Sequence, residues 1–130
     1  MKKLPKFISQ RRKNANFFMK IFRSHPFLEI QKEIGQSSWF GFSLIIKKNY
    51  RIPRDKILKN LKKNGIDVRP IIAGNIVEHK MSKYFNYKKF NTLKNANYLN
   101  RNGFFIGNSH NDLEKEILQT YRVLDQKFYL

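Results

Sequence analysis

The stretch GIDVRPIIAGN, residues 65–75, decides how this chain folds. Its first residue, Gly65, tolerates the left-handed conformation that closes a helix, so we expect a helix to end there. The apolar, mostly β-branched side chains of residues 66–72 then predict a strand. That strand runs into a loop at residues 73–75. A helix end, a strand and a loop in so short a stretch are typical of an α/β domain.

Two further strands are predicted on either side of this stretch. Residues 39–47 form a dense apolar run, rich in aromatic and β-branched side chains and bounded by polar segments, which indicates a buried strand. Residues 103–107 contain three consecutive large apolar side chains and predict a third strand. Between the first two strands, Pro53 suits the first turn of the helix that ends at Gly65.

Helices are predicted at both ends of the chain. Residues 8–23 place apolar side chains at helical spacing among basic ones, and the helix is expected to stop before Pro26. Near the other end, Asn111 and Glu114 have the spacing of a capping box, which predicts the start of a last helix. Shorter helices are predicted over 78–85 and 93–102.

The order of these elements predicts an α/β fold, a small two-layer α/β sandwich of about three strands with covering helices. A long amphipathic helix, within residues 1–25, precedes the sandwich at residues 38–130. No linker divides the chain, so 1–130 is expected to be a single small domain. The first helix has no obvious strand partner in the sequence.

The charge balance is strongly basic. The chain has 27 Lys and Arg residues against 9 Asp and Glu, a formal net charge of +18. This balance favours anionic partners such as nucleic acid or phosphorylated ligands, but a biased composition spread over the surface explains it equally well. Aromatic and Lys residues alternate at 83–90, as in single-strand binders, or in a loop whose aromatic rings lie partly in the core. One hypothesis is therefore a stand-alone basic module that binds nucleic acid or another polyanion.

Several kinds of site are excluded or disfavoured by the sequence. Cysteine is absent, so the chain has no disulfide and no thiolate metal site, and a reducing cytoplasm is the predicted location. No apolar run approaches the ~20 residues that a membrane-spanning helix needs, so no membrane association is expected. The three histidines have no metal-ligand spacing and are interpreted as surface or satisfied structural residues. No glycine-rich phosphate loop is present.

Three stretches together resemble a known family. They are WFGF at residues 39–42, GIDVRPIIAGN at 65–75 and NGFFIGN at 102–108. In this order and spacing they resemble the C-terminal small domain of the DegT/DnrJ/StrS sugar aminotransferase family. Within the family the similarity is to the CDP-4-keto-6-deoxyglucose 3-dehydratase branch of lipopolysaccharide sugar synthesis. The basic start of the chain, residues 4–13, resembles the stretch where that branch's interdomain helix begins.

The resemblance implies a fold type I enzyme that uses pyridoxal phosphate (PLP) and acts on a nucleotide-linked keto sugar, by amination or by 3-dehydration. It also implies that a large N-terminal domain supplies the catalytic Lys or His and the PLP site. Because neither can be assigned here, we expect an inactive C-terminal fragment, with no catalytic, cofactor-binding or metal-binding residue, that holds no PLP alone. A separately encoded PLP domain is one partner that would complete it. Self-association is also expected, if Phe17, Phe18 and Phe22 are left exposed.

Four residues are the candidates for substrate contacts in that context. Arg69 offers a guanidinium to an anionic sugar nucleotide. Asn75 offers hydrogen bonds to a sugar hydroxyl, and Gly74 lets the backbone come close. His110 follows the third strand, where a loop could face the cleft. The alternative is structural, with Arg69 in a salt bridge and Gly74-Asn75 as a simple turn.

Overall fold

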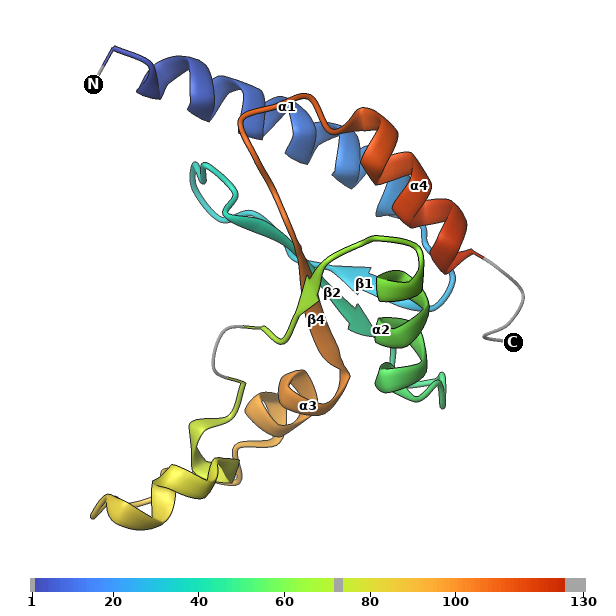
Figure 1. Ribbon diagram of the computed structural model, residues 1–130. Coiled ribbons are helices and arrows are strands. Elements are labelled where there is room, and N and C mark those ends of the chain that lie inside the picture. Colours follow the sequence, from blue (N-terminus) through green and yellow to red (C-terminus); the bar gives the residue numbers. More distant parts are fainter. Residues whose placement is uncertain (1, 72–73, 126–130) are drawn as a thin grey trace.

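The computed structural model describes residues 2–71 and 74–125. Within them the chain forms an α/β domain, as the sequence predicts (Figure 1). In chain order, the elements are α1 (Leu4–Phe22), β1 (Leu28–Ile30), β2 (Gly41–Ile46), α2 (Arg54–Lys63), β3 (Val68–Arg69), the 3₁₀ turns η1 (Ile76–Glu78) and η2 (Lys80–Tyr84), α3 (Lys94–Asn102), β4 (Gly103–Gly107) and α4 (Glu114–Leu124).

The strands form one antiparallel sheet in the order β1-β2-β4-β3. All three expected strands are present, and the structure adds β1, which pairs Leu28 with Ile46. Three residues are too few to give a sequence period, which is why this edge strand was missed. The strand predicted over 66–72 is shorter than expected, because Pro70 has no N–H with which to continue the ladder. Of that prediction, residues 72–73 lie outside the described residues.

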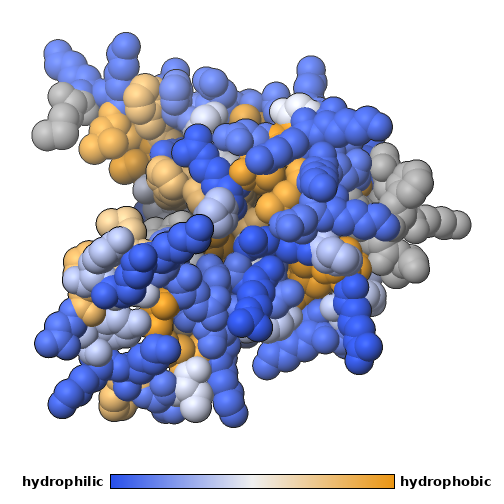
Figure 2. Space-filling view, turned by 60° about the horizontal axis from the view of Figure 1, so that its bottom comes forward, coloured by the Kyte–Doolittle hydropathy of each residue, from blue (hydrophilic) through white to orange (hydrophobic). Residues whose placement is uncertain are grey.

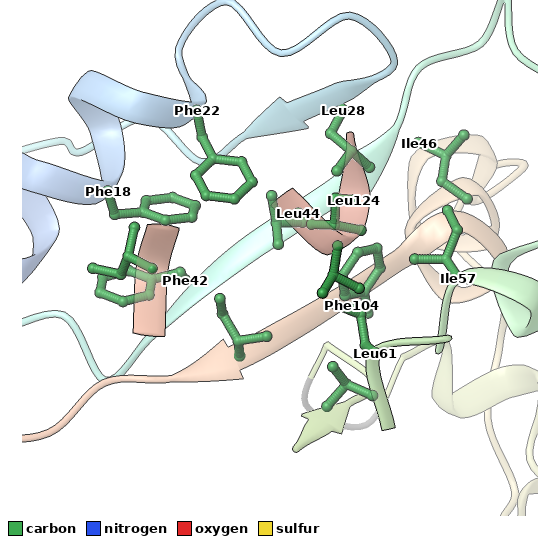
Figure 3. Packing of buried hydrophobic residues seen from close by; sticks show 14 of the residues in the cluster. Phe18, Phe22, Leu28, Phe42, Leu44, Ile46, Ile57, Leu61, Phe104 and Leu124 are labelled. Carbon is green, nitrogen blue, oxygen red and sulfur yellow. The ribbon is translucent and has the colours of Figure 1, made fainter. Parts of the chain in front are cut away.

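One face of the sheet is buried under three helices. Phe42 pairs with Ile106 and Leu44 with Phe104, and all four side chains are buried on that face. Helices α1, α2 and α4 all contribute side chains to the same apolar cluster (Figure 3). The opposite face carries the alternate side chains, among them Ser43, Ile45 and Phe105, which are only partly buried. The domain therefore has two layers, with one sheet face left largely uncovered.

Helix α1 packs on this sheet. Phe18 and Phe22 are fully buried, and the Phe18 ring stacks on Phe42 of β2 with their centroids 4.4 Å apart (Figure 3). The expectation that these two side chains are exposed is wrong, because the helix finds its partner within the chain. Phe17 is half-buried. Helix α4 lies beside α1 and closes the same core.

The structure confirms one of the two predicted helix ends and contradicts the other. Gly65 has a φ of +75° and closes α2, as predicted. The capping box is wrong. The α4 cap carries no side-chain capping bond, and Asp112 Oδ1 instead accepts from the Glu114 N–H at 3.0 Å. The Asn111 carbonyl accepts from the Asn14 side chain at 2.8 Å, so Asn111 serves the packing of α1.

Residues 76–93 project from the domain, at the lower left of Figure 1. The helix predicted over 78–85 is replaced by η1 and η2. The expectation that aromatic rings of residues 83–90 lie partly in the core is wrong, since Tyr84, Phe85 and Phe90 are all exposed. Figure 2, which brings this side forward, shows hydrophobic groups between predominantly hydrophilic ones. None of the helices described is long and apolar enough to cross a bilayer.

Candidate functional site

A hollow of about 210 Å³ lies at the end of β4, beside β3. It is lined by Phe40, Asp67, Arg69, Phe105, Gly107 and Asn108. Phe105 and Arg69 are direct partners in the β3–β4 ladder, so both lie on the sheet face that the helices leave uncovered. The hollow thus combines two aromatic rings, a carboxylate, a guanidinium and an amide within a small space.

Arg69 is the one sequence candidate that lines this hollow. Its guanidinium lies 3.4 Å from Asp67 Oδ2, and both side chains are mostly exposed. The salt bridge of the structural alternative is therefore present. An exposed ion pair contributes only about 0–1 kcal/mol, so this contact leaves the guanidinium able to turn toward an anionic ligand.

The rings of Phe40 and Phe105 lie close to this ion pair. Their centroids are 5.9 Å apart and their planes are inclined by 48°. Phe40 is 75% exposed although it is fully apolar. Aromatic faces next to a guanidinium are suited to a planar base followed by an anionic group.

Asn108 forms one wall of the hollow and is held by several bonds. Its Nδ2 donates to the carbonyls of Arg11 and Trp39, both at 3.0 Å. Its Oδ1 accepts from Nδ2 of Asn14, which is buried in α1. The amide therefore joins α1, the end of β4 and the segment before β2 at one point.

Arg11 and Arg12, which the sequence places on the polar face of the first helix, fasten the same segment. Arg11 donates to the Trp39 carbonyl through Nε and Nη2, at 3.1 and 2.7 Å. Arg12 Nε donates to the Ser37 carbonyl at 2.9 Å. These guanidiniums help to hold the chain that leads into Phe40.

Gly74 and Asn75 lie toward the other end of β4. Ile71, just before them, packs beside Gly103 at the start of β4. Gly74 has a φ of +61°, and a Cβ there would meet the side chain of Asn100 in α3. The buried Asn75 side chain donates to Asn97 Oδ1 and accepts from the Val77 N–H at 3.2 Å. Both residues therefore build the turn that leads into η1.

His110 lies near α1 instead. Its ring is 4.3 Å from that of Phe7, centroid to centroid. It follows β4 beyond Gly107, whereas Gly74 and Asn75 lie toward the opposite end of this strand. The structure therefore does not bring the four candidates into one site, and Arg69 alone lines the hollow.

His25 departs from the expectation of a surface or satisfied histidine. The ring is fully buried, and neither nitrogen has a hydrogen-bond partner in the described part of the chain. It lies against Phe22, Phe27 and Tyr121. Burial lowers its pKa from 6.5 to about 4, with Asp125 opposing this shift and Lys47 adding to it. This histidine is a core residue and plays no part in the hollow.

The hollow does not fit PLP as its resident group. No lysine or histidine lines it, so no side chain there can form the internal aldimine or replace it. The described residues also contain no cluster of His, Asp and Glu suited to a metal ion. The hollow is suited to binding a ligand, because its ion pair and its two aromatic rings complement the charged and planar parts of a nucleotide.

Comparison with known proteins identifies the family. The profile of the DegT/DnrJ/EryC1/StrS aminotransferase family matches residues 1–122. The chain belongs to this family. The resemblance carried by residues 39–42, 65–75 and 102–108 is thus confirmed.

Two curated relatives are GDP-4-keto-6-deoxy-D-mannose 3-dehydratases. That of Escherichia coli O55:H7 is 49% identical over 118 residues, which is 90% of this chain and 30% of the relative. That of Yersinia pseudotuberculosis is 43% identical, over 95% of this chain and 32% of the relative. A lipopolysaccharide biosynthesis protein of Salmonella typhimurium is 26% identical. The first two relatives carry in their names the 3-dehydratase reaction of the predicted branch, together with GDP and mannose.

Solved structures give the same result. The E. coli GDP-4-keto-6-deoxy-D-mannose-3-dehydratase with bound hydrated PLP matches 95% of this chain and 32% of its own, with a TM-score of 0.92 and 48% identity. A Helicobacter pylori aminotransferase of pseudoaminic acid biosynthesis matches with a TM-score of 0.77 at 18% identity, which supports the fold alone. The chain thus corresponds to the small domain of fold type I PLP enzymes and spans about a third of their length. These matches do not support a nucleic-acid-binding module.

Sequence reasoning missed Phe40, Asp67, Phe105 and Asn108 as members of the hollow. All four lie inside the stretches that carry the family resemblance. The missing information was the strand register, which places Arg69 opposite Phe105. The signal that could have grouped these four residues is the alternation of exposed side chains along the predicted strands.

Proposed function

We propose that this chain is the small-domain part of a PLP-dependent 3-dehydratase that acts on a GDP-linked 4-keto-6-deoxy sugar. The observation that carries the proposal is the 49% and 43% identity to two such dehydratases over almost the whole chain. A 3-dehydratase is favoured over an aminotransferase because both of these relatives carry that reaction in their names.

Within this activity, Arg69 binds the nucleotide part of the substrate in the hollow. A guanidinium forms paired, charge-assisted bonds with diphosphate oxygens, and Arg69 is free to do so beyond its weak contact with Asp67. Phe40 and Phe105 supply ring faces for the base. When Arg69 turns to the diphosphate, the Asp67 carboxylate becomes an acceptor for the N–H groups of a guanine edge.

The other three candidates contribute less in this proposal. Asn75 is engaged at both ends of its amide, so it acts on the sugar only if it exchanges one of these bonds. Gly74 supports it by allowing the turn. His110 is exposed beside Phe7 and stays a candidate at the rim of the site.

The chemistry itself is assigned to a large domain that carries PLP. PLP, when bound there, supplies the electron sink for loss of the C3 hydroxyl. We expect this chain alone to hold no PLP, and a PLP domain, fused or separately encoded, to be its partner. The cytoplasmic location stays a prediction, with which the cysteine-free sequence is compatible.

The test is reconstitution with the PLP domain of the E. coli relative, fused to this chain or co-expressed with it. The expected result, with glutamate supplied as the amino donor for the cofactor, is turnover of GDP-4-keto-6-deoxy-D-mannose, together with visible PLP absorbance that survives dialysis. This chain alone should retain no such absorbance. Turnover of a CDP-linked sugar in preference to the GDP-linked one would contradict the choice of nucleotide.

Arg69→Lys tests the site within that enzyme. The substitution keeps the charge but loses the planar fork, so it should raise the apparent KM and lower turnover. Arg51→Lys is the matched control, because Arg51 is exposed and outside the hollow. If Arg69→Lys equals the parent in both turnover and apparent affinity, Arg69 is structural only.

A further inference from the structure

We infer that Asn108 is a positioning residue for the nucleotide site: its amide fixes the backbone at residues 39–40 so that the Phe40 ring stands over the hollow. This inference rests on the proposed function, because it assigns a task to a wall of the same hollow. Asn108 lies outside the set that the sequence predicts for the site, which is Arg69, Gly74, Asn75 and His110.

The first observation is that Asn108 holds two consecutive carbonyls. Its side-chain Nδ2 donates to the Trp39 carbonyl at 3.0 Å, and its backbone N–H donates to the Phe40 carbonyl at 3.3 Å. The same Nδ2 also donates to the Arg11 carbonyl at 3.0 Å. One residue thus ties the peptide groups on both sides of Phe40 to the end of β4.

The second observation is backbone strain at the adjoining residue. Trp39 has a φ of +52°, a left-handed conformation that costs a bulky residue free energy and persists only where its surroundings enforce it. Here Arg11 and Asn108 hold the Trp39 carbonyl, and the Ser37 hydroxyl accepts from its N–H at 2.9 Å. The indole itself is buried.

The strained turn determines where the two neighbouring aromatic side chains lie. It directs the Trp39 ring into the core and leaves Phe40, its neighbour, 75% exposed beside Phe105. The Phe40 ring thus lies at the surface, in the hollow that it shares with the Arg69–Asp67 pair.

Asn14 fixes which way the Asn108 amide points. Asn14 is buried, and its Nδ2 donates to Asn108 Oδ1 at 3.0 Å, so the Asn108 Nδ2 must face the two carbonyls. An aspartate at 108 would place a carboxylate oxygen against the carbonyls of Arg11 and Trp39. Asn108→Asp therefore retains the size but loses the side-chain bonds to the Arg11 and Trp39 carbonyls, and Asn108→Ala loses them without adding charge. The backbone bond to the Phe40 carbonyl stays in both variants, so they test the amide alone.

The experiment is an NMR titration of the ¹⁵N-labelled chain with GDP as the probe, up to about 10 mM, a range that detects even weak binding. Tryptophan fluorescence gives a second signal, since Trp39 is the single tryptophan of the chain. GDP should shift the backbone signals of Phe40, Arg69 and Phe105. In Asn108→Asp and Asn108→Ala, the dissociation constant should rise at least about tenfold, and the shift at Phe40 should be lost while that at Arg69 persists.

The matched control is Asn102→Ala, which removes a side-chain bond to the Tyr98 carbonyl outside the hollow. It should bind GDP as the parent does, and all titrations are run well below the melting temperature of each variant. Equal affinity of the Asn108 variants and the parent, with Phe40 still shifting, overturns the positioning role and leaves the proposed function standing. A parent chain that shows no shift at any of the three residues overturns the nucleotide site itself.

Discussion

The two ends of the sheet differ in how far the chain satisfies its own groups. At the Gly107 end, the buried Asn14 amide engages five partners, and the neighbouring arginines hold the loop before β2. At the Gly103 end, the projecting segment 76–93 is fastened at its base, where Glu78 contacts the side chains of Asn100 and Arg101. Beyond that base it carries exposed aromatic rings.

The difference separates what this chain builds alone from what it offers to a partner. Buried amides with every partner present stabilise a single arrangement of α1, β4 and α4. Exposed large apolar groups gathered on one segment mark a surface that other molecules can cover. We therefore expect substitutions that remove these hydrogen bonds to destabilise the first region. The second region is expected to tolerate substitution.

The largest effect is expected in the apolar core between the sheet and its covering helices. Phe104 is fully buried between the sheet and its covering helices, so Phe104→Ala should lower the free energy of unfolding by about 3–5 kcal/mol. Phe85→Ala, in the projecting segment and 60% exposed, should change it by less than about 0.5 kcal/mol. Urea unfolding followed by circular dichroism measures both, and similar losses would contradict the comparison.

The next effect depends on pH and arises at the end of α1. The pKa of His25 is about 4 in the folded chain and 6.5 otherwise, so the unfolded state binds the proton first as the pH falls. Stability from the neutral ring is therefore complete above pH 6.5 and is lost as the pH falls toward 4, by up to about 3 kcal/mol.

His25→Phe removes this titration and keeps a ring among Phe22, Phe27 and Tyr121. Unfolding free energies at pH 7 and pH 4.5 should differ more in the parent than in the variant. Carboxylates titrate in both proteins and cancel in this difference. The same pH dependence in both would show that the buried ring is not the group responsible.

The buried residues Asn14 and Asn75 allow a direct comparison of the two ends of the sheet. Asn14→Ala leaves the Leu113 N–H and two backbone carbonyls without their partner, so it should cost about 2–3 kcal/mol. Asn75→Ala loses bonds to Val77 and Asn97 and should cost about 1 kcal/mol, because fewer groups are abandoned. Thermal melts of the two variants rank them, and a larger loss for Asn75→Ala would reverse the comparison.

The sequence predicted the parts of this fold that depend on local chemistry. The strand at 103–107 and the closure of α2 at Gly65 follow from runs of apolar residues and from glycine's backbone freedom. The capping box failed because the helix begins only at Glu114, after a turn that Asn14, far away in the sequence, holds through the Asn111 carbonyl and the Leu113 N–H. Residues of the hollow were missed for the same reason: Arg69 and Phe105 meet only through the strand register.

The smallest effect on stability is expected at the tip of the projecting segment, where Phe90 is 88% exposed. Phe90→Ser should leave the free energy of unfolding within about 0.5 kcal/mol of the parent, because the ring loses almost no contacts. It should nevertheless reduce self-association of the isolated chain, since exposed rings such as Phe90 and Tyr84 supply the apolar surface that Phe18 and Phe22 do not. Sedimentation velocity across a concentration series, in moderate salt to screen the +18 charge, measures this. Lys89→Ser, beside it on the same segment, is the control and should not reduce association. A parent chain that stays monomeric throughout would show that the exposed rings do not drive self-association.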